Sequence, residues 1–194
     1  MTDQQLVHEI LYGNSQKAFE LLVEKYQRLV VMTCRGFLSN YADAEDLAQE
    51  VFIEVFQSLH RFRNESKLST WLYRIAVNKS LNFVRRQKRR RIFESLDRLF
   101  SDKANGHNLH DLQNMSNGTP DGQIQIAEDR KVLKQVINSL PDNQRIAFIL
   151  NKYMDLTYKE VAEVMNISLP AVESLLFRAR TNLQKKILGK RNME

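Results

Sequence analysis

The side chains of this sequence that could perform chemistry are few, and most of them lack partners at the required spacing. Asp46 and Glu50 lie four residues apart, one turn on a helix, so their carboxylates could share a divalent cation. No histidine or further motif joins them, and no nucleophile motif or phosphate-binding loop is present. Cys34 is the single cysteine, which excludes an internal disulfide and a thiolate-rich zinc site, and His107 with His110 lacks a third ligand nearby. We therefore expect no metal site, no cofactor, no catalytic residue and no enzymatic activity.

A mixture of cations and aromatic rings is the stronger chemical signal. Cations at positions 85, 86 and 88–91 suit contacts to phosphates, although an exposed helix end would have the same composition. Upstream, over 61–83, aromatic residues are interspersed with arginines and lysines, as expected where unpaired bases stack on rings while cations follow the strand. Each ring could instead belong to the core. Asn78 differs, because an amide is disfavoured in mid-helix and could read the edge of an extruded base.

The last part of the chain carries the pattern of a helix-turn-helix. Thr157 and Glu160 form a capping box that opens one helix, and a second helix follows the short connection 166–168. Such a connection predicts a steep crossing, with Asn166 in the left-handed conformation that the turn needs. A simple helical hairpin is the alternative. In a helix-turn-helix the second helix enters the DNA major groove, and its expected outward side chains are Ala171, Ser174, Arg178 and Thr181.

The elements that position these residues are predicted to be helices. Apolar residues recur at helical spacing in both halves of the chain, and β-branched alternation is absent, which indicates an all-α protein. The stretch 101–122, rich in glycine and polar residues, cannot bury enough surface to offset its ordering entropy. We therefore expect two small helical domains, 1–95 and 126–194, joined by a flexible polar linker over 96–125.

Capping residues set the expected helix starts. A long helix is expected over 15–38, Asp43 is the expected N-cap of the next helix, and Ser69 that of a fourth helix ending in the basic run. Apolar residues at helical spacing mark two further helices around 133–140 and 146–153, and Ser168 is the expected N-cap of the last.

Charge is distributed unevenly along the chain. Residues 1–60 hold four Lys/Arg against nine Asp/Glu, a net charge of −5, whereas residues 61–91 hold eleven against one, a net charge of +10. The basic part favours polyanions, with nucleic acid the first candidate and an anionic membrane surface the competitor. No apolar run is long enough to span a bilayer or to form a signal-peptide core, so we expect a cytoplasmic protein without membrane insertion.

Three segments of the sequence resemble a known family. DAEDLAQEVF followed by STWLYRIAVNKSLNFVRR resembles the second conserved region of sigma factors of the extracytoplasmic-function (ECF) group. SLPDNQRIAFILNKYMDLTYKEVAEVMNISLPAVESLLFRAR resembles the fourth region of that group. The segments occur in the family's order. The resemblance implies an alternative sigma factor, which brings bacterial RNA polymerase to promoters and melts the DNA there.

The resemblance also implies partners and a role for each surface. The partners are the RNA polymerase core, through the clamp helices of its largest subunit and the flap of its second largest, promoter DNA, and an inhibitory anti-sigma factor. The residues expected to bind the core are Asp43, Asp46, Leu47, Gln49, Glu50 and Phe52. Those expected to bind and melt the minus-ten element are Phe62, Arg63, Lys67, Trp71, Arg74, Asn78, Lys79, Arg85 and Arg86. Those expected to read the minus-thirty-five element are Lys159, Ala171, Glu173, Ser174, Phe177 and Arg178.

Two residues depart from the pattern of the family, and two other functions remain possible for the chain. Glu173 and Leu175 stand where many members of the family have arginines, so upstream recognition is expected to be weaker or tuned to another sequence. A stand-alone helix-turn-helix regulator would bind DNA tightly without polymerase, and it leaves the acidic DAEDLAQE helix unexplained. A nucleic-acid enzyme built on Asp46 would need divalent metal.

Overall fold

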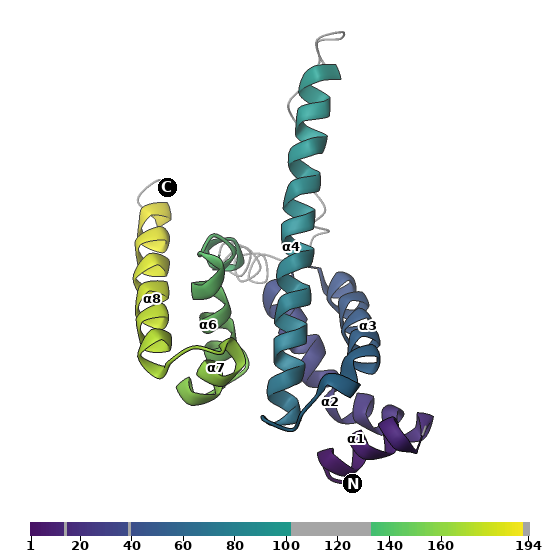
Figure 1. Ribbon diagram of the computed structural model, residues 1–194. Helices are drawn as coiled ribbons and strands as arrows, with labels where there is room; N and C mark the ends of the chain where they lie inside the picture. Colours follow the sequence, from purple (N-terminus) through teal and green to yellow (C-terminus); the bar gives the residue numbers. More distant parts are fainter. Residues whose placement is uncertain (14, 39, 102–132, 192–194) are drawn as a thin grey trace, which may run out of the picture.

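The computed structural model describes residues 1–13, 15–38, 40–101 and 133–191, with side chains described to residue 94 and to residue 188 in the last two ranges. Every regular element in these ranges is helical, which confirms the predicted all-α fold. Residues 133–138 are helical as well. The labelled helices (Figure 1) are α1 (Asp3–Tyr12), α2 (Gln16–Phe37), α3 (Tyr41–Ser58), the short η1 (Leu59–Arg61), α4 (Leu68–Ser101), α6 (Asp142–Lys152), α7 (Tyr158–Met165) and α8 (Leu169–Arg191).

Helices α2, α3 and α4 pack on one another and form the first unit, with α1 against α2. The Ser15 hydroxyl accepts a hydrogen bond from the Ala18 N–H at 3.2 Å, so the predicted start of α2 is confirmed. The core is built from side chains that recur every three or four residues on each helix, as an amphipathic helix requires. Its fully buried members include Leu22, Val30, Val51 and Leu72.

Two predicted N-caps of this unit are wrong. Asn40 caps α3, because its side-chain oxygen accepts a hydrogen bond from the Ala42 N–H at 3.0 Å, and Asp43 lies inside the first turn. A carboxylate there still interacts favourably with the helix dipole. Helix α4 begins at Leu68, so Ser69 is already helical. Several polar residues stand near each helix start, and the chain's path from the preceding element decides which of them caps.

Helix α4 is also longer than expected. It runs to Ser101, past the predicted domain boundary at residue 95, and it projects beyond the other helices (Figure 1). Its second half is rich in arginine, which is a good helix former, and contains neither glycine nor proline. The remainder of the predicted linker, from residue 102, lies outside the described residues.

The second unit contains the predicted helix-turn-helix. Asn166 ends α7 with φ 54° and ψ 50°, the left-handed conformation expected of it, and α8 begins three residues later. The buried stripe on α8 consists of Val172, Leu176, Ala179 and Leu183. Val161 on α7 is fully buried beside it, so the helix pair is closed by apolar contacts and not by the turn alone.

The capping box of α7 offers a test of local stability. Thr157 Oγ1 accepts from the Glu160 N–H at 3.3 Å, and Glu160 Oε2 accepts from the Thr157 N–H at 3.0 Å. The hydrogen bonds that the Thr157 N–H and then the Thr157 hydroxyl donate to the Glu160 carboxylate lower the pKa of that carboxyl. We expect Thr157→Ala to lower the free energy of unfolding by about 1 kcal/mol, because the Glu160 N–H loses its acceptor and the Glu160 carboxylate loses the hydroxyl that donates to it.

Urea unfolding followed by circular dichroism measures the loss. Thr157→Ser is the matched control, since it keeps the hydroxyl and should stay close to the wild type. Equal midpoints for Thr157→Ala and the wild type would show that the cap contributes nothing.

Candidate nucleic-acid interface

A stripe of exposed side chains runs along α3. Its first half is polar, with Asp46, Gln49 and Glu50 exposed and Asp43 half-buried. Its second half is apolar, because Ile53 and Phe56 are each 57% exposed. The Phe56 ring lies edge-on to Phe19, with the ring centroids 5.0 Å apart. We call Asp46, Gln49, Glu50, Ile53 and Phe56 the α3 stripe; it combines acceptors with anchors of the kind that protein partners bury.

Two residues expected on this surface are in the core instead. Leu47 is 2% exposed and Phe52 is 9% exposed, and both belong to the hydrophobic cluster inside the first unit. A docked partner could not reach them without unfolding the helix packing. Ile53 and Phe56 were missed by sequence reasoning, although the signal was present: once the buried positions of α3 are assigned, these two apolar residues fall on the opposite face.

The aromatic residues near the start of α4 are largely structural. Phe62 is buried, and its ring centroid lies 5.4 Å from that of Trp71, which is half-buried. Phe62 is therefore not available as a stacking platform, contrary to the expectation, while Trp71 presents one part of its ring to solvent. Arg63 and Lys67 in the preceding loop are exposed, and Asn64 there has φ 56°. The loop thus carries two cations beside a buried ring.

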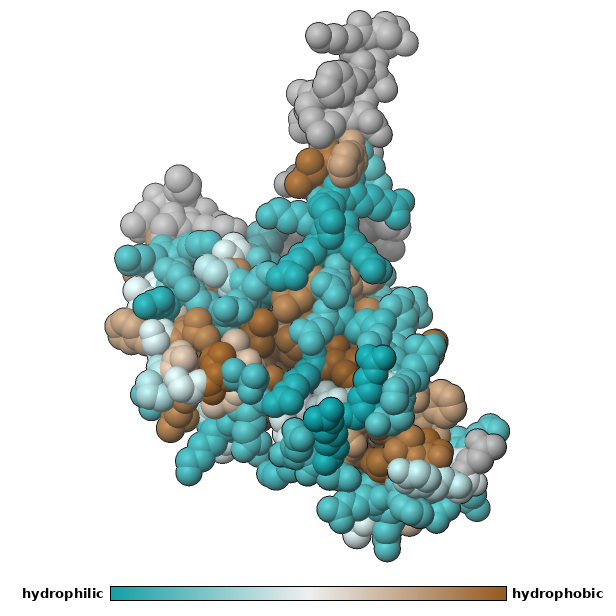
Figure 2. Space-filling view, in the orientation of Figure 1, coloured by the Kyte–Doolittle hydropathy of each residue, from teal (hydrophilic) through white to brown (hydrophobic). Residues whose placement is uncertain are grey.

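The cations of α4 fall into two groups. Arg86 and its neighbours up to Arg90 are exposed on the projecting half of the helix, where hydrophilic residues cover the surface (Figure 2). Of these, Arg90 pairs only with Glu94 among the described residues, an exposed carboxylate one turn further along α4, at 2.8 Å. The other group has partners on other helices. Lys79 pairs with Glu54 at 3.0 Å, and Arg74 and Arg85 bind groups of the second unit. A cationic surface that extends past the packed helices is suited to a nucleic-acid backbone.

Asn78 lies at the junction of two clefts. One cleft, of about 760 Å³, separates α3 from α4 and is lined by acidic α3 residues on one side and by Lys79 and Arg86 on the other. The other cleft, of about 700 Å³, lies between α4 and the second unit and is also lined by Asn78. The Asn78 side chain is exposed, and no hydrogen bond to another described residue involves it. Its amide is thus free to pair with an incoming base.

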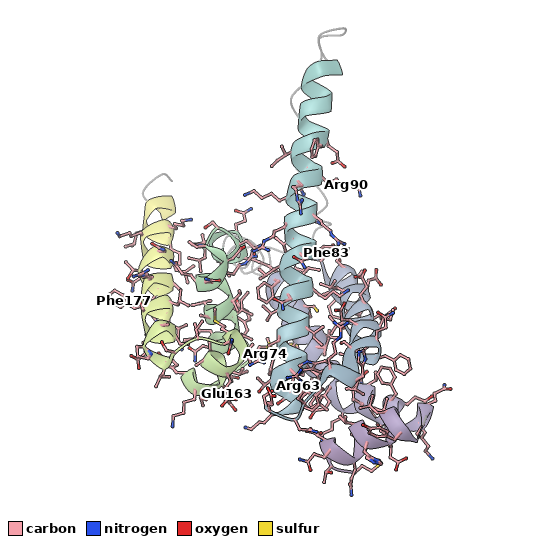
Figure 3. All side chains as sticks on the ribbon, in the orientation of Figure 1. Arg63, Arg74, Phe83, Arg90, Glu163 and Phe177 are labelled. Atoms are coloured by element: carbon pink, nitrogen blue, oxygen red, sulfur yellow. The ribbon has the colours of Figure 1, made fainter. Side chains whose placement is uncertain are left out.

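The outward face of α8 presents the residues expected to reach a major groove. Glu173, Ser174 and Arg178 are exposed, Ala171 is half-buried, and Phe177 is 70% exposed and points away from both units (Figure 3). Lys159 on α7 is exposed too. Leu175 is partly buried against the core, so it stabilises the packing of α8.

Metal and thiol chemistry find no support in the described parts of the chain. There, no three His, Cys, Asp or Glu side chains gather closely enough to hold a metal ion. Cys34 is fully buried, and burial raises the pKa of its thiol to about 11, so it stays protonated and unreactive. Across the same residues, no helix combines the length and the apolar character needed to cross a membrane.

Two family models match the chain, one for each unit. The Sigma-70 region 2 model matches residues 22–90, and the Sigma-70 region 4 model matches residues 130–183. The ECF RNA polymerase sigma-E factor of Haemophilus influenzae is 37% identical over 193 residues, which cover 96% of both chains. The protein of the same name from Escherichia coli K12 is 35% identical over 188 residues, covering 96% of this chain and 95% of that one.

Solved structures with a similar fold come with a bound partner. CnrH in complex with the cytosolic domain of CnrY matches with a TM-score of 0.64 and 20% identity, over 96% of this chain and 97% of that one. The sigma factor RpoE of Bartonella quintana, in complex with the anti-sigma factor NepR, matches with a TM-score of 0.56 and 21% identity, over 88% of this chain and 97% of that one. Both likenesses concern the arrangement of the helices.

Proposed function

This chain belongs to the ECF group of RNA polymerase sigma factors, and from that premise we propose that α3 holds the polymerase core while α4 opens promoter DNA and α8 reads it. The observation that carries this division is the cleft between α3 and α4, which is lined by Asp43, Glu50 and Glu54 of α3 and by Lys79, Arg86 and Arg90 of α4. A partner held on α3 lies directly beside DNA held on α4. Holding the two together is what initiation requires, because melting must occur next to the polymerase.

The contact with polymerase is assigned to the exposed side of α3. Asp43, Asp46, Gln49 and Glu50 are retained as core-binding residues, and Ile53 and Phe56 replace the buried Leu47 and Phe52. The proposed docking partner is the pair of clamp helices of the largest subunit. The second unit is assigned to the flap of the second largest subunit.

Phe56→Ala tests this assignment. The ring is more than half exposed, so truncating it should hardly affect folding. We expect polymerase core to bind the variant roughly fivefold more weakly, because an exposed aromatic anchor loses about 1 kcal/mol of contact on truncation. Tyr12→Ala removes another exposed aromatic ring, on α1, and should bind as the wild type does. Equal affinities for Phe56→Ala and Tyr12→Ala, measured by titration of labelled core, would remove Phe56 from the interface.

Promoter melting is assigned to α4 and the loop before it. Asn78 is the candidate for pairing with an extruded base of the minus-ten element, with Trp71 as wall of that pocket. Phe62 is proposed to support Trp71 from the core. The cations proposed to follow the separated strand are Arg63, Lys67, Arg74, Lys79, Arg85 and Arg86.

Reading of the upstream, minus-thirty-five element is assigned to the outward face of α8. Arg178 can donate to guanine or to a phosphate, and Phe177 can contact the methyl group of thymine. The Ser174 hydroxyl can donate to or accept from a base edge. Glu173 can accept from the amino group of cytosine. Lys159 and Ala171 complete the proposed contact surface. Apolar and acidic residues at this surface favour an upstream element that differs from one read by arginines.

The deciding experiment is transcription with a reconstituted enzyme. Polymerase core supplemented with this chain should make run-off RNA from a subset of templates in a genomic fragment library, and core alone should not. Sequencing the transcript starts would yield both promoter elements at once. Absence of any chain-dependent RNA, with core that is active with another sigma factor, would refute the function.

The proposal also covers catalysis, location and regulation. The protein acts by binding and carries no catalytic residue or cofactor of its own, since the chemistry of RNA synthesis belongs to polymerase. It acts in the cytoplasm, where polymerase and chromosome are. An anti-sigma factor is the proposed inhibitor, and the structures of CnrH and of the Bartonella quintana RpoE, each with a bound partner, motivate a search for one.

A further inference from the structure

The second half of α4 carries a dense run of cations that is followed by two exposed apolar side chains. Residues 84–94 hold six Lys/Arg against one Glu, a net charge of +5. Directly after the last cation come Ile92 and Phe93, which are 50% and 65% exposed and lie outside the hydrophobic cluster of the described residues. Figure 2 shows hydrophobic surface at this level of α4, above the hydrophilic surface of its middle part. This part of the helix therefore combines positive charge with apolar surface.

Helical geometry places the apolar pair and two of the cations on one face. Arg89 lies three residues before Ile92 and four before Phe93, and Arg86 lies seven residues before Phe93. Residues three or four apart are neighbours on a helix surface, and residues seven apart lie on the same side two turns away. We call Arg86, Arg89, Ile92 and Phe93 the distal face of α4.

The distal face is presented to solvent with its charge uncompensated. Arg86 and Arg89 are exposed, and neither forms an ion pair with another described residue. Two neighbouring arginines differ, because Arg85 is bound by the second unit at 2.7 Å and Arg90 by Glu94 at 2.8 Å. Helix α4 projects past the packed helices at this level, and Arg90 stands clear of them in Figure 3. The face is therefore open to a partner that carries negative charge.

Nucleic acid accounts for the cations of the distal face but not for its apolar pair. Phosphates attract arginines through charge alone. A phenylalanine ring can stack on an unpaired base, whereas an exposed isoleucine beside it has no such use. Adjacent apolar side chains that are each at least half exposed are typical of a surface that another apolar molecule covers. Ile92 also borders a cleft beside the start of α3, so Phe93 is the main anchor of the pair.

A lipid surface fits the shape of this face better than a folded protein does. A stable protein interface covers roughly 800 Å² on each partner, which four side chains on one projecting helix do not supply. A bilayer surface is deformable and can surround a single helix, with its phosphates on the cations and its acyl boundary on the apolar side chains. Arg89 and Arg86 lie about 6 and 10 Å behind Phe93 along the helix axis. That spacing is comparable to the roughly 5–10 Å that apolar side chains penetrate into the interface.

We propose that the distal face of α4 is a peripheral binding site for anionic membrane surfaces. Phe93 and Ile92 enter the headgroup region, and Arg89 and Arg86 bind the lipid phosphates. The chain lies on the membrane and does not cross it. Arg86 is also assigned to the promoter strand, so lipid and DNA compete for it, and a chain held at the membrane is kept from promoters. Only this competition rests on the function proposed above, and the lipid contact does not.

Co-sedimentation of the full chain with vesicles tests the site. Vesicles of phosphatidylglycerol and phosphatidylcholine in equal parts should bind the wild type at least tenfold more tightly than vesicles of phosphatidylcholine alone, and added salt should weaken that binding. Phe93→Ser should bind the anionic vesicles roughly tenfold more weakly, because the side chain that left water is gone. Equal binding of the two kinds of vesicle, or equal binding of Phe93→Ser and the wild type, would overturn the proposal.

Phe93→Leu is the matched control for this variant. Leucine keeps an apolar side chain at the position, so its affinity for the anionic vesicles should stay close to that of the wild type. The Phe93 ring is mostly exposed, and serine and phenylalanine have similar helix propensities, so neither substitution should disturb folding. Circular dichroism checks this point. If Phe93→Leu lost as much affinity as Phe93→Ser, burial of an apolar side chain would not be the cause, which would contradict the proposed contact.

A fluorophore that is sensitive to its surroundings tests where the helix meets the lipid. On Phe93→Cys its emission should shift to shorter wavelength when anionic vesicles are added, and on Tyr12→Cys, an exposed position of α1, it should not shift. Cys34 is fully buried and stays unlabelled under native conditions. No shift at position 93, or an equal shift at both positions, would show that the distal face is not the site of contact.

Fluorescence anisotropy with a labelled single-stranded DNA of random sequence separates lipid from nucleic acid. Phe93→Ser should bind this probe as the wild type does, because the cations of the distal face are unchanged. A loss of DNA affinity as large as the loss of vesicle affinity would assign the ring to nucleic acid and overturn the proposal. Run-off transcription with Phe93→Ser reports the sigma function separately, so failure of that function and failure of the lipid contact are distinguishable.

Discussion

Asn78→Ala is expected to slow open-complex formation by a factor between about 5 and 150 while leaving the affinity for polymerase core unchanged. The range corresponds to the roughly 1–3 kcal/mol that a well-placed amide contributes to recognition of one base. Asn78 is exposed at the junction of two clefts and makes no hydrogen bond to another described residue, so its amide is available to an extruded base. Alanine is the better helix former of the two, so the variant should fold at least as stably.

Core affinity and melting are measured separately for this variant. Titration of labelled core reports the affinity, and permanganate footprinting of unpaired thymines reports the melted region. Asn82→Ala removes another exposed amide one turn further along α4 and is the matched control, expected to melt DNA at the wild-type rate. Parallel loss of core affinity and of melting in Asn78→Ala would refute the base-pocket role, because it would place the defect before DNA is opened.

Arg178→Ala is expected to weaken recognition of the upstream element by about 1–3 kcal/mol, and to relax the preference at one or two neighbouring positions only. Arg178 is exposed on the outward face of α8, beside Ser174 and the largely exposed Phe177. A guanidinium there can donate two parallel bonds to guanine, and a truncated side chain donates none. The effect should therefore depend on the base, not merely on total charge.

The measurement is holoenzyme binding to a library of promoters randomised upstream, compared with the wild type at one salt concentration. Arg180→Ala is the control, because Arg180 Nη2 donates to the Tyr158 hydroxyl at 3.0 Å and is turned back toward α7. We expect Arg180→Ala to leave the base preferences as they are. A uniform loss across all sequences in Arg178→Ala would assign this residue to phosphate, and an unchanged profile would remove it from the interface.

Features that depend on neighbouring residues in the chain were predictable. The capping box at Thr157, the left-handed Asn166 and the stripe from Val172 to Leu183 all follow from rules that span a few residues, and the structure confirms each. The all-α fold and the sigma-factor family were also predictable, because helical periodicity and motif spacing are written in consecutive residues. The residue at which each helix starts was predicted less well, because several polar residues can cap one helix. Asn40, which caps α3 in place of Asp43, is an example.

The face of α3 that meets solvent was only partly predictable. Helix α3 carries four large apolar residues: Leu47, Phe52, Ile53 and Phe56. The helical period alone gives two ways to divide them between core and surface. The packing of α2 and α4 decides that the first two are buried and the last two exposed. That choice changes which residues are assigned to the polymerase contact.

By itself, the sequence determined the helices, the capping box of α7, the two units and the segments of opposite charge, because each depends on interactions between residues close in the chain. The tertiary structure alone decided which members of those segments are free. Arg74 and Arg85 look equivalent to their neighbours in the basic helix, yet they bind groups 89 and 57 residues away. Such pairings arise where packed helices bring distant segments together, and no local pattern of residue types encodes them.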